Sequence, residues 1–199
     1  MNVLLTTYPR TGQHILAANL KHSLDIELDT SHGMFLELDT SHGMFITKDH
    51  DLKITIVRDP VDSITSWVCM ELHYTDLSPI RKPQPIDFYI KADITKFIMF
   101  HNYALKNVDI FIKYEDVVNN MDKIINYLSK TYGINKTNEL MDHKIISEPS
   151  ERHIVTSKPY SKYDDVLEKV LHSKEHEDFG SSKVMEYYNM CLKKCIVLT

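Results

Sequence analysis

The sequence predicts an α/β domain in which helices flank a central parallel sheet. Three short apolar runs rich in β-branched residues, at 3–7, 53–57 and 108–114, are typical of buried strands. A segment with helical spacing of apolar residues follows each run. Strands that alternate with helices indicate a parallel sheet, because parallel strands need crossover connections. Ligands of such sheets bind at the carboxyl ends of the strands, so we expect a site in the residues that follow them.

The helical patterns have recognisable starts and stops. Pro60 suits the first turn of a helix, Asp116 is an expected N-cap, and Gly133 suits a helix end. We expect irregular structure at 77–85 and at 137–160, with two helices in the C-terminal part 137–199. The expected helices start near His14 and then cover 61–74, 86–107, 117–133, 161–173 and 181–194.

Length and composition exclude several classes of protein. The 199 residues suit a single domain, and 43% hydrophobic with 26% charged residues is ordinary for a globular protein. The net charge of −5 argues against a nucleic-acid binder. No apolar run approaches the roughly 20 residues that cross a bilayer, and the first residues do not resemble a signal peptide. Three cysteines suit reduced thiols, so we expect a cytoplasmic protein with no membrane partner.

A ten-residue segment occurs twice in tandem between the first two predicted strands. Residues 26–35, IELDTSHGMF, are followed by LELDTSHGMF at 36–45, and nine of the ten positions are identical. The period is shorter than the roughly 20–50 residues of solenoid repeats. We therefore interpret the pair as a duplication within one domain, of which one copy carries the original role.

The first candidate site is the loop TYPRTG between the first strand and the first helix. Arg10 supplies a fixed positive charge, Thr11 supplies a hydroxyl, and Gly12 precedes a helix start whose backbone N–H groups suit an anion. This pattern predicts a phosphate cradle, although the GxxxxGK[ST] pattern is absent. The alternative is an ordinary strand–helix turn with Arg10 as a surface charge.

The second candidate site follows the strand at 53–57. Arg58 leaves the strand end, and Ser66 lies two turns into the following helix. Both side chains are able to reach one phosphate, the arginine as a bidentate donor and the serine through its hydroxyl. The alternative is that Arg58 pairs with Asp59 or Asp62 and that Ser66 only packs.

The third candidate site follows the strand at 108–114. Tyr114 stands at the strand end, where its ring is able to stack on a base or to hydrogen-bond to one. The alternative is a packed tyrosine beside a helix-capping sequence.

In this order the three motifs resemble the PAPS-dependent sulfotransferase family. TTYPRTGQHIL is similar to its 5′-phosphosulfate loop, commonly TYPKSGTTWL, and TIVRDPVDSITSW to its 3′-phosphate motif, commonly RNPKDVAVSYY. IFIKYEDV is similar to the strand whose tyrosine approaches the adenine. The resemblance spans residues 3 to about 118. It implies a P-loop-type three-layer sandwich that transfers a sulfuryl group from PAPS to a hydroxyl or amine, releases PAP and needs no metal ion.

The resemblance also implies roles for particular residues. Arg10 would stabilise the 5′-phosphosulfate, Arg58 and Ser66 would hold the 3′-phosphate, and Tyr114 would approach the adenine. Arg152, in the basic stretch 152–158, is a candidate for the segment that grips the 3′-phosphate in many members. The backbone N–H groups expected to hold the phosphosulfate are those of Thr11, Gly12, Gln13 and His14.

A base should take the proton of the acceptor, and the family often places it in a KTH-type strand end between the first two motifs. Here the match is Thr-Ser-His, which the duplication supplies twice, as His32 and His42. We favour His42, because it is continuous with the second motif. The alternative is that neither histidine is catalytic and that His-Gly forms a turn at a strand end. His14, at the helix start, competes for the same role.

Two other functions are compatible with the same residues. A nucleotide or small-molecule kinase of related fold would prefer ATP with magnesium. A non-catalytic PAPS-binding protein is suggested by Arg10, which stands where the family has lysine, and by Gln13 and His14, which replace hydroxyl residues. The acceptor, whether a small molecule, a glycan or a peptide, is not indicated, since 31–50 and 68–90 carry no diagnostic pattern.

Overall fold

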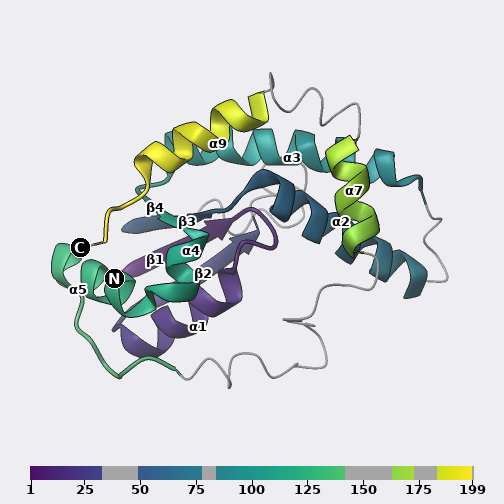
Figure 1. The fold of residues 1–199 in the computed structure, drawn as a ribbon. Helices are drawn as coiled ribbons and strands as arrows, with labels where there is room; N and C mark the ends of the chain where they lie inside the picture. Colours follow the sequence, from purple (N-terminus) through teal and green to yellow (C-terminus); the bar gives the residue numbers. More distant parts are fainter. Residues whose placement is uncertain (33–48, 78–83, 142–162, 173–182, 199) are drawn as a thin grey trace.

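The α/β class is confirmed by a computed structural model, which describes residues 1–32, 49–77, 84–141, 163–172 and 183–198 (Figure 1). The described strands form one all-parallel sheet in the order β2-β1-β3-β4. Three of them match the predicted strands. The fourth is an edge strand, which the first copy of the duplicated segment forms. The strands are β1 (Asn2–Thr7), β2 (Glu27–His32), β3 (Leu52–Val57) and β4 (Ile110–Lys113).

The register of the sheet brings the carboxyl ends of the strands to one edge. Thr7 of β1 is the partner of His32 in β2, and Val57 of β3 is the partner of Lys113 in β4. The residues that follow β1, β3 and β4 therefore emerge side by side. These residues begin the three motifs that the sequence singled out.

The described helices agree with the predicted ones except around Asn120. The predicted helix 117–133 is two helices, because Asn120 leaves the helical conformation (φ −133°, ψ 33°). The expectation that Asp116 is an N-cap is wrong: it lies in the first turn of the earlier helix and accepts a hydrogen bond from Asn120 Nδ2 at 2.8 Å. The helices are α1 (Gln13–Ser23), α2 (Pro60–Leu77), α3 (Ile86–Asn107), α4 (Tyr114–Asn119), α5 (Met121–Tyr132), α7 (Tyr163–His172) and α9 (Lys183–Lys194).

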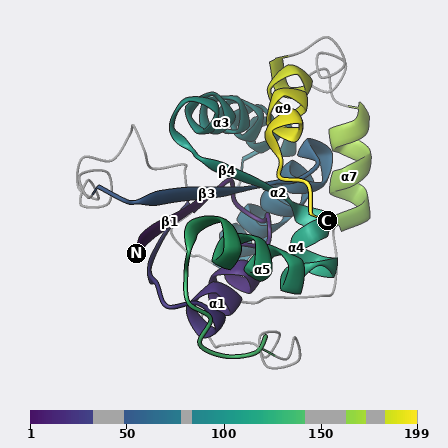
Figure 2. The ribbon, with the colours of Figure 1, turned by 90° about the vertical axis from the view of Figure 1, so that its left-hand side faces the viewer.

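Helices cover both faces of the sheet, which gives three layers (Figure 2). On one side, which we call the aliphatic face, α1 and α5 pack on the strands. On the other, the aromatic face, α2, α3, α7 and α9 pack around Tyr8, Phe97 and Phe111. The aliphatic face buries side chains such as Val3, Leu5, Leu16, Leu20, Ile54, Ile112, Ile124 and Leu128. No helix in the described ranges is both long and apolar enough to span a membrane.

Candidate functional site

The loop between β1 and α1 has an unusual backbone that its own side chains support. Arg10 has a φ of 64°, a left-handed conformation that side chains other than glycine rarely adopt. Thr11 Oγ1 donates a hydrogen bond to the Tyr8 carbonyl at 2.7 Å, which closes the turn. Gly12, with a φ of 85°, is the N-cap of α1, and no side chain in the described part of the chain caps that helix. The loop therefore delivers an uncapped helix N-terminus to the carboxyl edge of the sheet, where an anion is favoured.

Tyr114 packs directly against this loop. A Cβ atom added to Gly12 would lie 3.1 Å from Tyr114 Cε2, so a larger residue there would require the Tyr114 ring to shift. Tyr114 is the first residue of α4, one step beyond β4. The first and third motifs are thus in contact.

Arg10, Arg58 and Ser66 are joined by hydrogen bonds across the same edge. Arg10 Nε donates to Ser66 Oγ at 3.1 Å, and Arg58 Nη1 donates to the Arg10 carbonyl at 2.6 Å. Ser66 is almost fully buried, on the side of α2 that faces the loop. The first and second motifs therefore form one cluster, although the residues involved are about 50 positions apart.

Arg58 is held in place without being neutralised. Its guanidinium carbon lies 4.3 Å from the centre of the Tyr114 ring, a cation–π contact. Its Nε is buried and has no hydrogen-bond partner among the described residues. Asp62 approaches Nη2 only at 3.9 Å and is half exposed, so it contributes little. A buried guanidinium donor without an acceptor is costly, and an anion would satisfy it.

The Gln13 side chain has a structural role that sequence reasoning missed. Its Oε1 accepts a hydrogen bond from Thr7 Oγ1 at 3.0 Å, and its Nε2 donates to the Ser31 carbonyl at 3.2 Å. These bonds fasten the start of α1 to the ends of β1 and β2. The side chain is therefore turned into the protein, which leaves only its backbone N–H for the role suggested by the sequence.

The candidate histidines are placed differently. His14 is exposed in the first turn of α1. His32 is the last residue of β2, opposite Thr7, so its backbone lies at the carboxyl edge beside the loop. His42 and Arg152 lie outside the described residues.

A buried polar cluster adjoins the loop on the aromatic face, and the sequence analysis did not single it out. The Tyr8 hydroxyl donates to the Asp93 carbonyl at 3.2 Å, while Lys96 Nζ lies 2.9 Å from Asp93 Oδ1 and 3.5 Å from Glu71 Oε1. Burial, with Glu71 adding to it, raises the pKa of the Asp93 carboxyl to about 7 despite Lys96. The signal in the sequence was an Asp–Lys pair three residues apart within an apolar helix.

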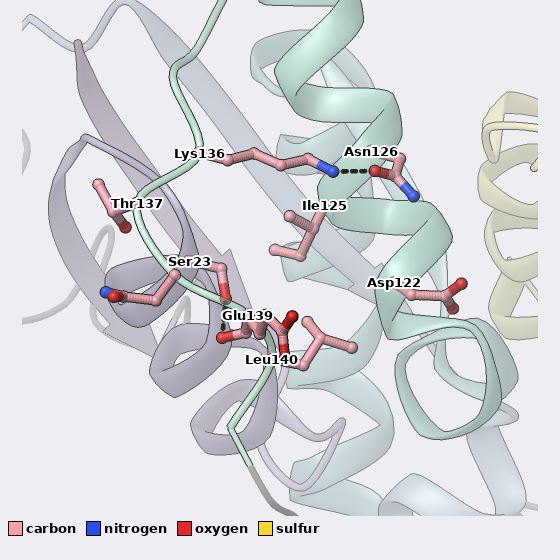
Figure 3. Close-up of a pocket in the computed structure, with 9 residues that line it drawn as sticks. Ser23, Asp122, Ile125, Asn126, Lys136, Thr137, Glu139 and Leu140 are labelled. Carbon is pink, nitrogen blue, oxygen red and sulfur yellow. Dashed lines mark hydrogen bonds between the residues drawn. The ribbon is translucent and has the colours of Figure 1, made fainter.

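A cavity of about 640 Å³ lies at the opposite edge of the sheet (Figure 3). It opens beside Ser23, at the far end of α1, about 16 Å along the helix from Gly12 for 11 residues. Lys136 Nζ already donates to Asn126 Oδ1, and Ser23 Oγ donates to the Glu139 carbonyl at 3.3 Å. Among the described residues that line the cavity, Lys136 is the only cation, so the carboxyl edge with Arg10 and Arg58 is the better candidate for an anionic ligand.

The structure is an α/β protein in which two arginines, Arg10 and Arg58, meet at the carboxyl edge of the sheet beside Ser66 and Tyr114. No protein-family model matches the sequence, and no curated protein matches it either.

Proposed function

We propose that this chain is a PAPS-dependent sulfotransferase with a P-loop-type fold. The observation that carries the proposal is the cluster of Arg10, Arg58 and Ser66, in which three motif residues from two strand–helix units share hydrogen bonds. The resemblance of the sequence to that family assigns the same residues to the phosphates of the nucleotide. The contact between Gly12 and Tyr114 adds the third motif to the same place.

The residues present fit a nucleotide with phosphates at both its 3′ and 5′ positions. Arg58 has a buried Nε that needs an acceptor, and Arg58 and Ser66 are each hydrogen-bonded to Arg10, which suits a shared 3′-phosphate. The uncapped start of α1 suits the 5′-phosphosulfate, which backbone N–H groups from Thr11 to His14 would bind. Tyr114 would lie near the base. PAPS, when bound, supplies the activated sulfuryl group.

Sulfuryl transfer resembles phosphoryl transfer, in which charge spreads over the equatorial oxygens during an in-line displacement. Positioning and charge stabilisation therefore dominate the catalysis. Arg10 would stabilise the charge that develops on the leaving phosphate, but a guanidinium does not release a proton at ordinary pH. A histidine would take the proton of the acceptor, and the candidates are His32, His42 and His14.

A non-catalytic PAPS-binding protein is the second candidate, and one observation favours it. The Arg10 side chain is directed to Ser66 through its Nε, and arginine replaces the lysine of the family motif. A protein of this kind would bind PAP as tightly as an enzyme does and transfer nothing to any acceptor. The two candidates thus share a binding site and differ in turnover.

The experiment that tests the binding site is thermal unfolding with PAP, using ATP plus magnesium as the comparator. A ligand at 100 times its Kd should add about 2.7 kcal/mol, several degrees in Tm for a domain of this size. Stabilisation by PAP alone is the expected result. No response to PAP would contradict the proposal, and a response to ATP alone would indicate a kinase.

The matched control variants show whether the response to PAP depends on Arg58 itself or only on the charge of the protein. Arg58→Ala should abolish the response to PAP, whereas Lys21→Ala removes the same charge at the exposed far end of α1 and should leave the response intact. Arg58→Lys keeps the charge but loses the planar fork, so we expect a weakened response. Release of PAP from PAPS in the presence of a panel of acceptors then distinguishes the enzyme from the binding protein.

A further inference from the structure

Two contacts fix the orientation of the Arg58 guanidinium. Its Nη1 donates a hydrogen bond to the Arg10 carbonyl at 2.6 Å, and its carbon lies 4.3 Å from the centre of the Tyr114 ring. The side chain is only 17% exposed, and Asp62 Oδ2 lies 3.9 Å from Nη2, which is too far for a hydrogen bond. The guanidinium is therefore anchored at one nitrogen and stacked on one aromatic ring.

The anchored nitrogen leaves one side of the guanidinium for a ligand. In arginine, Nε and Nη2 carry N–H groups that point to the same side, and this pair suits two oxygens of one phosphate. We call this side of Arg58 the Nε–Nη2 edge. Its Nε is buried and has no hydrogen-bond partner among the described residues. The bond to Arg10 uses the remaining nitrogen, Nη1, so it does not occupy this edge.

The Tyr114 ring on which Arg58 stacks is itself closely packed. Tyr114 is the first residue of α4, and its side chain is partly buried against the aliphatic face. A Cβ atom added to Gly12 would lie 3.1 Å from Cε2 and 3.3 Å from Cδ2 of the ring, so this edge of the ring lies against the loop. One part of the ring thus contacts the loop, while one of its faces is covered by the guanidinium.

A fixed ring beneath an arginine increases affinity for a phosphate without touching the rest of the ligand. A free arginine side chain samples many rotamers, and binding must restrict it to one of them. The stacked Tyr114 ring restricts Arg58 before a ligand arrives, which lowers the entropic cost of binding. This effect acts through the phosphate contact, so it should be the same for ligands with and without a base.

We propose that Tyr114 is a positioning residue, which directs the Nε–Nη2 edge of Arg58 toward a phosphate and contributes to affinity through that arginine rather than through the base. The inference rests on the proposed function, which supplies the phosphate. It also defines the ligand class at this edge as sugar bisphosphates, for which the two phosphates suffice for measurable binding. The resemblance to the sulfotransferase family instead places this tyrosine near the adenine, and the two roles predict different binding data.

The test compares PAP with 1-deoxyribose 3,5-bisphosphate, an abasic ligand that keeps both phosphates. The Kd of each ligand is measured by calorimetry for the parent chain and for variants at Tyr114. Tyr114→Phe keeps the ring and removes the hydroxyl, whereas Tyr114→Leu removes the ring. If Tyr114→Leu does not fold, Tyr114→Met takes its place, since it fills the space without a ring. Tyr127→Leu is the control, because it removes a partly buried tyrosine of the same face from α5.

We expect Tyr114→Leu to weaken the binding of both ligands by the same factor, about tenfold. Tyr114→Phe and Tyr127→Leu should change neither Kd by more than about twofold, because the stacked ring is retained in both. In a chain that carries Arg58→Lys, which lacks the planar fork, Tyr114→Leu should have a much smaller effect on either Kd. A merely structural role of the ring would not produce this dependence on Arg58.

Other results would overturn the proposal. If Tyr114→Leu weakens the binding of PAP alone, or if the parent binds PAP but not the abasic ligand, then contacts to the base dominate. Unchanged affinity of Tyr114→Leu for both ligands would show that the stacked ring is not needed.

Failure of the proposed function gives a different result, in which the parent binds neither PAP nor the abasic ligand. The same variants are then compared with inorganic pyrophosphate as the probe. A loss of pyrophosphate binding in Tyr114→Leu, but not in Tyr114→Phe, would support the positioning role at a site for another phosphate ligand. A parent chain that does not bind pyrophosphate either would overturn the inference together with the function.

Discussion

The two faces of the sheet are stabilised in different ways. The aliphatic face buries hydrocarbon side chains from α1 and α5, and its buried polar groups, such as Gln13 and Asn19, carry no charge. The aromatic face buries Asp93 and His101 on α3, both almost without exposure to solvent. The aliphatic face should therefore contribute stability that does not depend on pH, whereas the aromatic face should make stability depend on pH.

The buried ionisable groups of the aromatic face lie next to the candidate site. Tyr8, which begins the loop, contacts both Phe97 and His101 with its ring and bonds to the Asp93 carbonyl. The aromatic face therefore carries the buried ionisable groups and also contributes, through Tyr8, to the support of the loop. Substitutions on the two faces separate the two contributions to stability.

The largest effect is expected from Leu20→Ala on the aliphatic face. Leu20 is fully buried between α1 and the sheet, and its truncation leaves a cavity. We expect a loss of about 3 kcal/mol in the free energy of unfolding. The loss should be equal at pH 5 and pH 8, as measured by urea unfolding at both values. A difference that varies with pH would contradict the comparison between the faces.

On the aromatic face, Asp93→Asn is expected to change how the free energy of unfolding depends on pH. Burial raises the pKa of the Asp93 carboxyl to about 7 in the folded protein, from an ordinary value of 3.8. The folded state therefore holds the proton more tightly than the unfolded state, and this contribution to stability is full below pH 4 and is lost as pH rises through 7. Asparagine does not titrate, so the variant does not lose stability in this way as pH rises.

The measurement is the difference in unfolding free energy between variant and parent across pH 4 to 8. It should move in favour of Asp93→Asn as pH rises, by on the order of 3 kcal/mol. Lys96→Met serves as the control, because it removes the cation that opposes the rise and should steepen the dependence. A flat difference for Asp93→Asn would show that the carboxyl titrates normally.

A smaller effect of opposite sign is expected from His101→Gln. Burial lowers the pKa of the His101 imidazole to about 4, although its Nδ1 lies 2.8 Å from the Phe97 carbonyl. The neutral ring contributes stability above its ordinary pKa of 6.5, and this is lost as pH falls through 4. The variant should therefore gain on the parent by on the order of 2 kcal/mol as the solution is acidified from pH 7 to 4.

A double variant, Asp93→Asn with His101→Gln, tests whether these two groups account for the pH dependence of stability. In the parent protein, the slopes that Asp93 and His101 impose between pH 4 and 6.5 have opposite signs and largely cancel. The double variant should show the same shallow dependence as the parent, while each single variant reveals one slope. A double variant with a steep dependence would indicate that other groups dominate this range.

Much of the fold follows from local patterns in the sequence. The apolar runs at β1, β3 and β4 and the described helices other than α4 and α5 had clear periodicity and were predicted correctly. The edge strand β2 has no continuous apolar run, since one of its faces is not covered by the core. The break at Asn120 was missed because the apolar spacing continues across it.

The candidate site was predicted in its parts but not in its connections. Spacing suggested that Arg58 and Ser66 share a phosphate, yet it gave no sign that Arg10 would bond to Ser66 or that Arg58 would hold the Arg10 carbonyl. These contacts depend on the left-handed conformation of Arg10. The residue types in the loop do not predict that conformation. The burial of Asp93 depends on how α2 and α3 pack, a long-range property that a single helix does not encode.

The smallest change in the free energy of unfolding is expected from alanine substitutions at two glycines, which lie in the layer formed by α1 and α5. Gly12 and Gly133 both have a positive φ, 85° and 66°, so alanine costs about 1 kcal/mol of backbone strain at either position. At Gly133 nothing lies within 4 Å of an added Cβ, and strain should be the whole effect. At Gly12 the added carbon meets Tyr114 at 3.1 Å, so the ring must move and with it the Arg58 guanidinium that stacks on it. Gly12→Ala should therefore cost more stability than Gly133→Ala. It should also weaken the Tm response to PAP, which Gly133→Ala should leave unchanged. Equal effects of the two variants on that response would show that Tyr114 does not contribute to PAP binding.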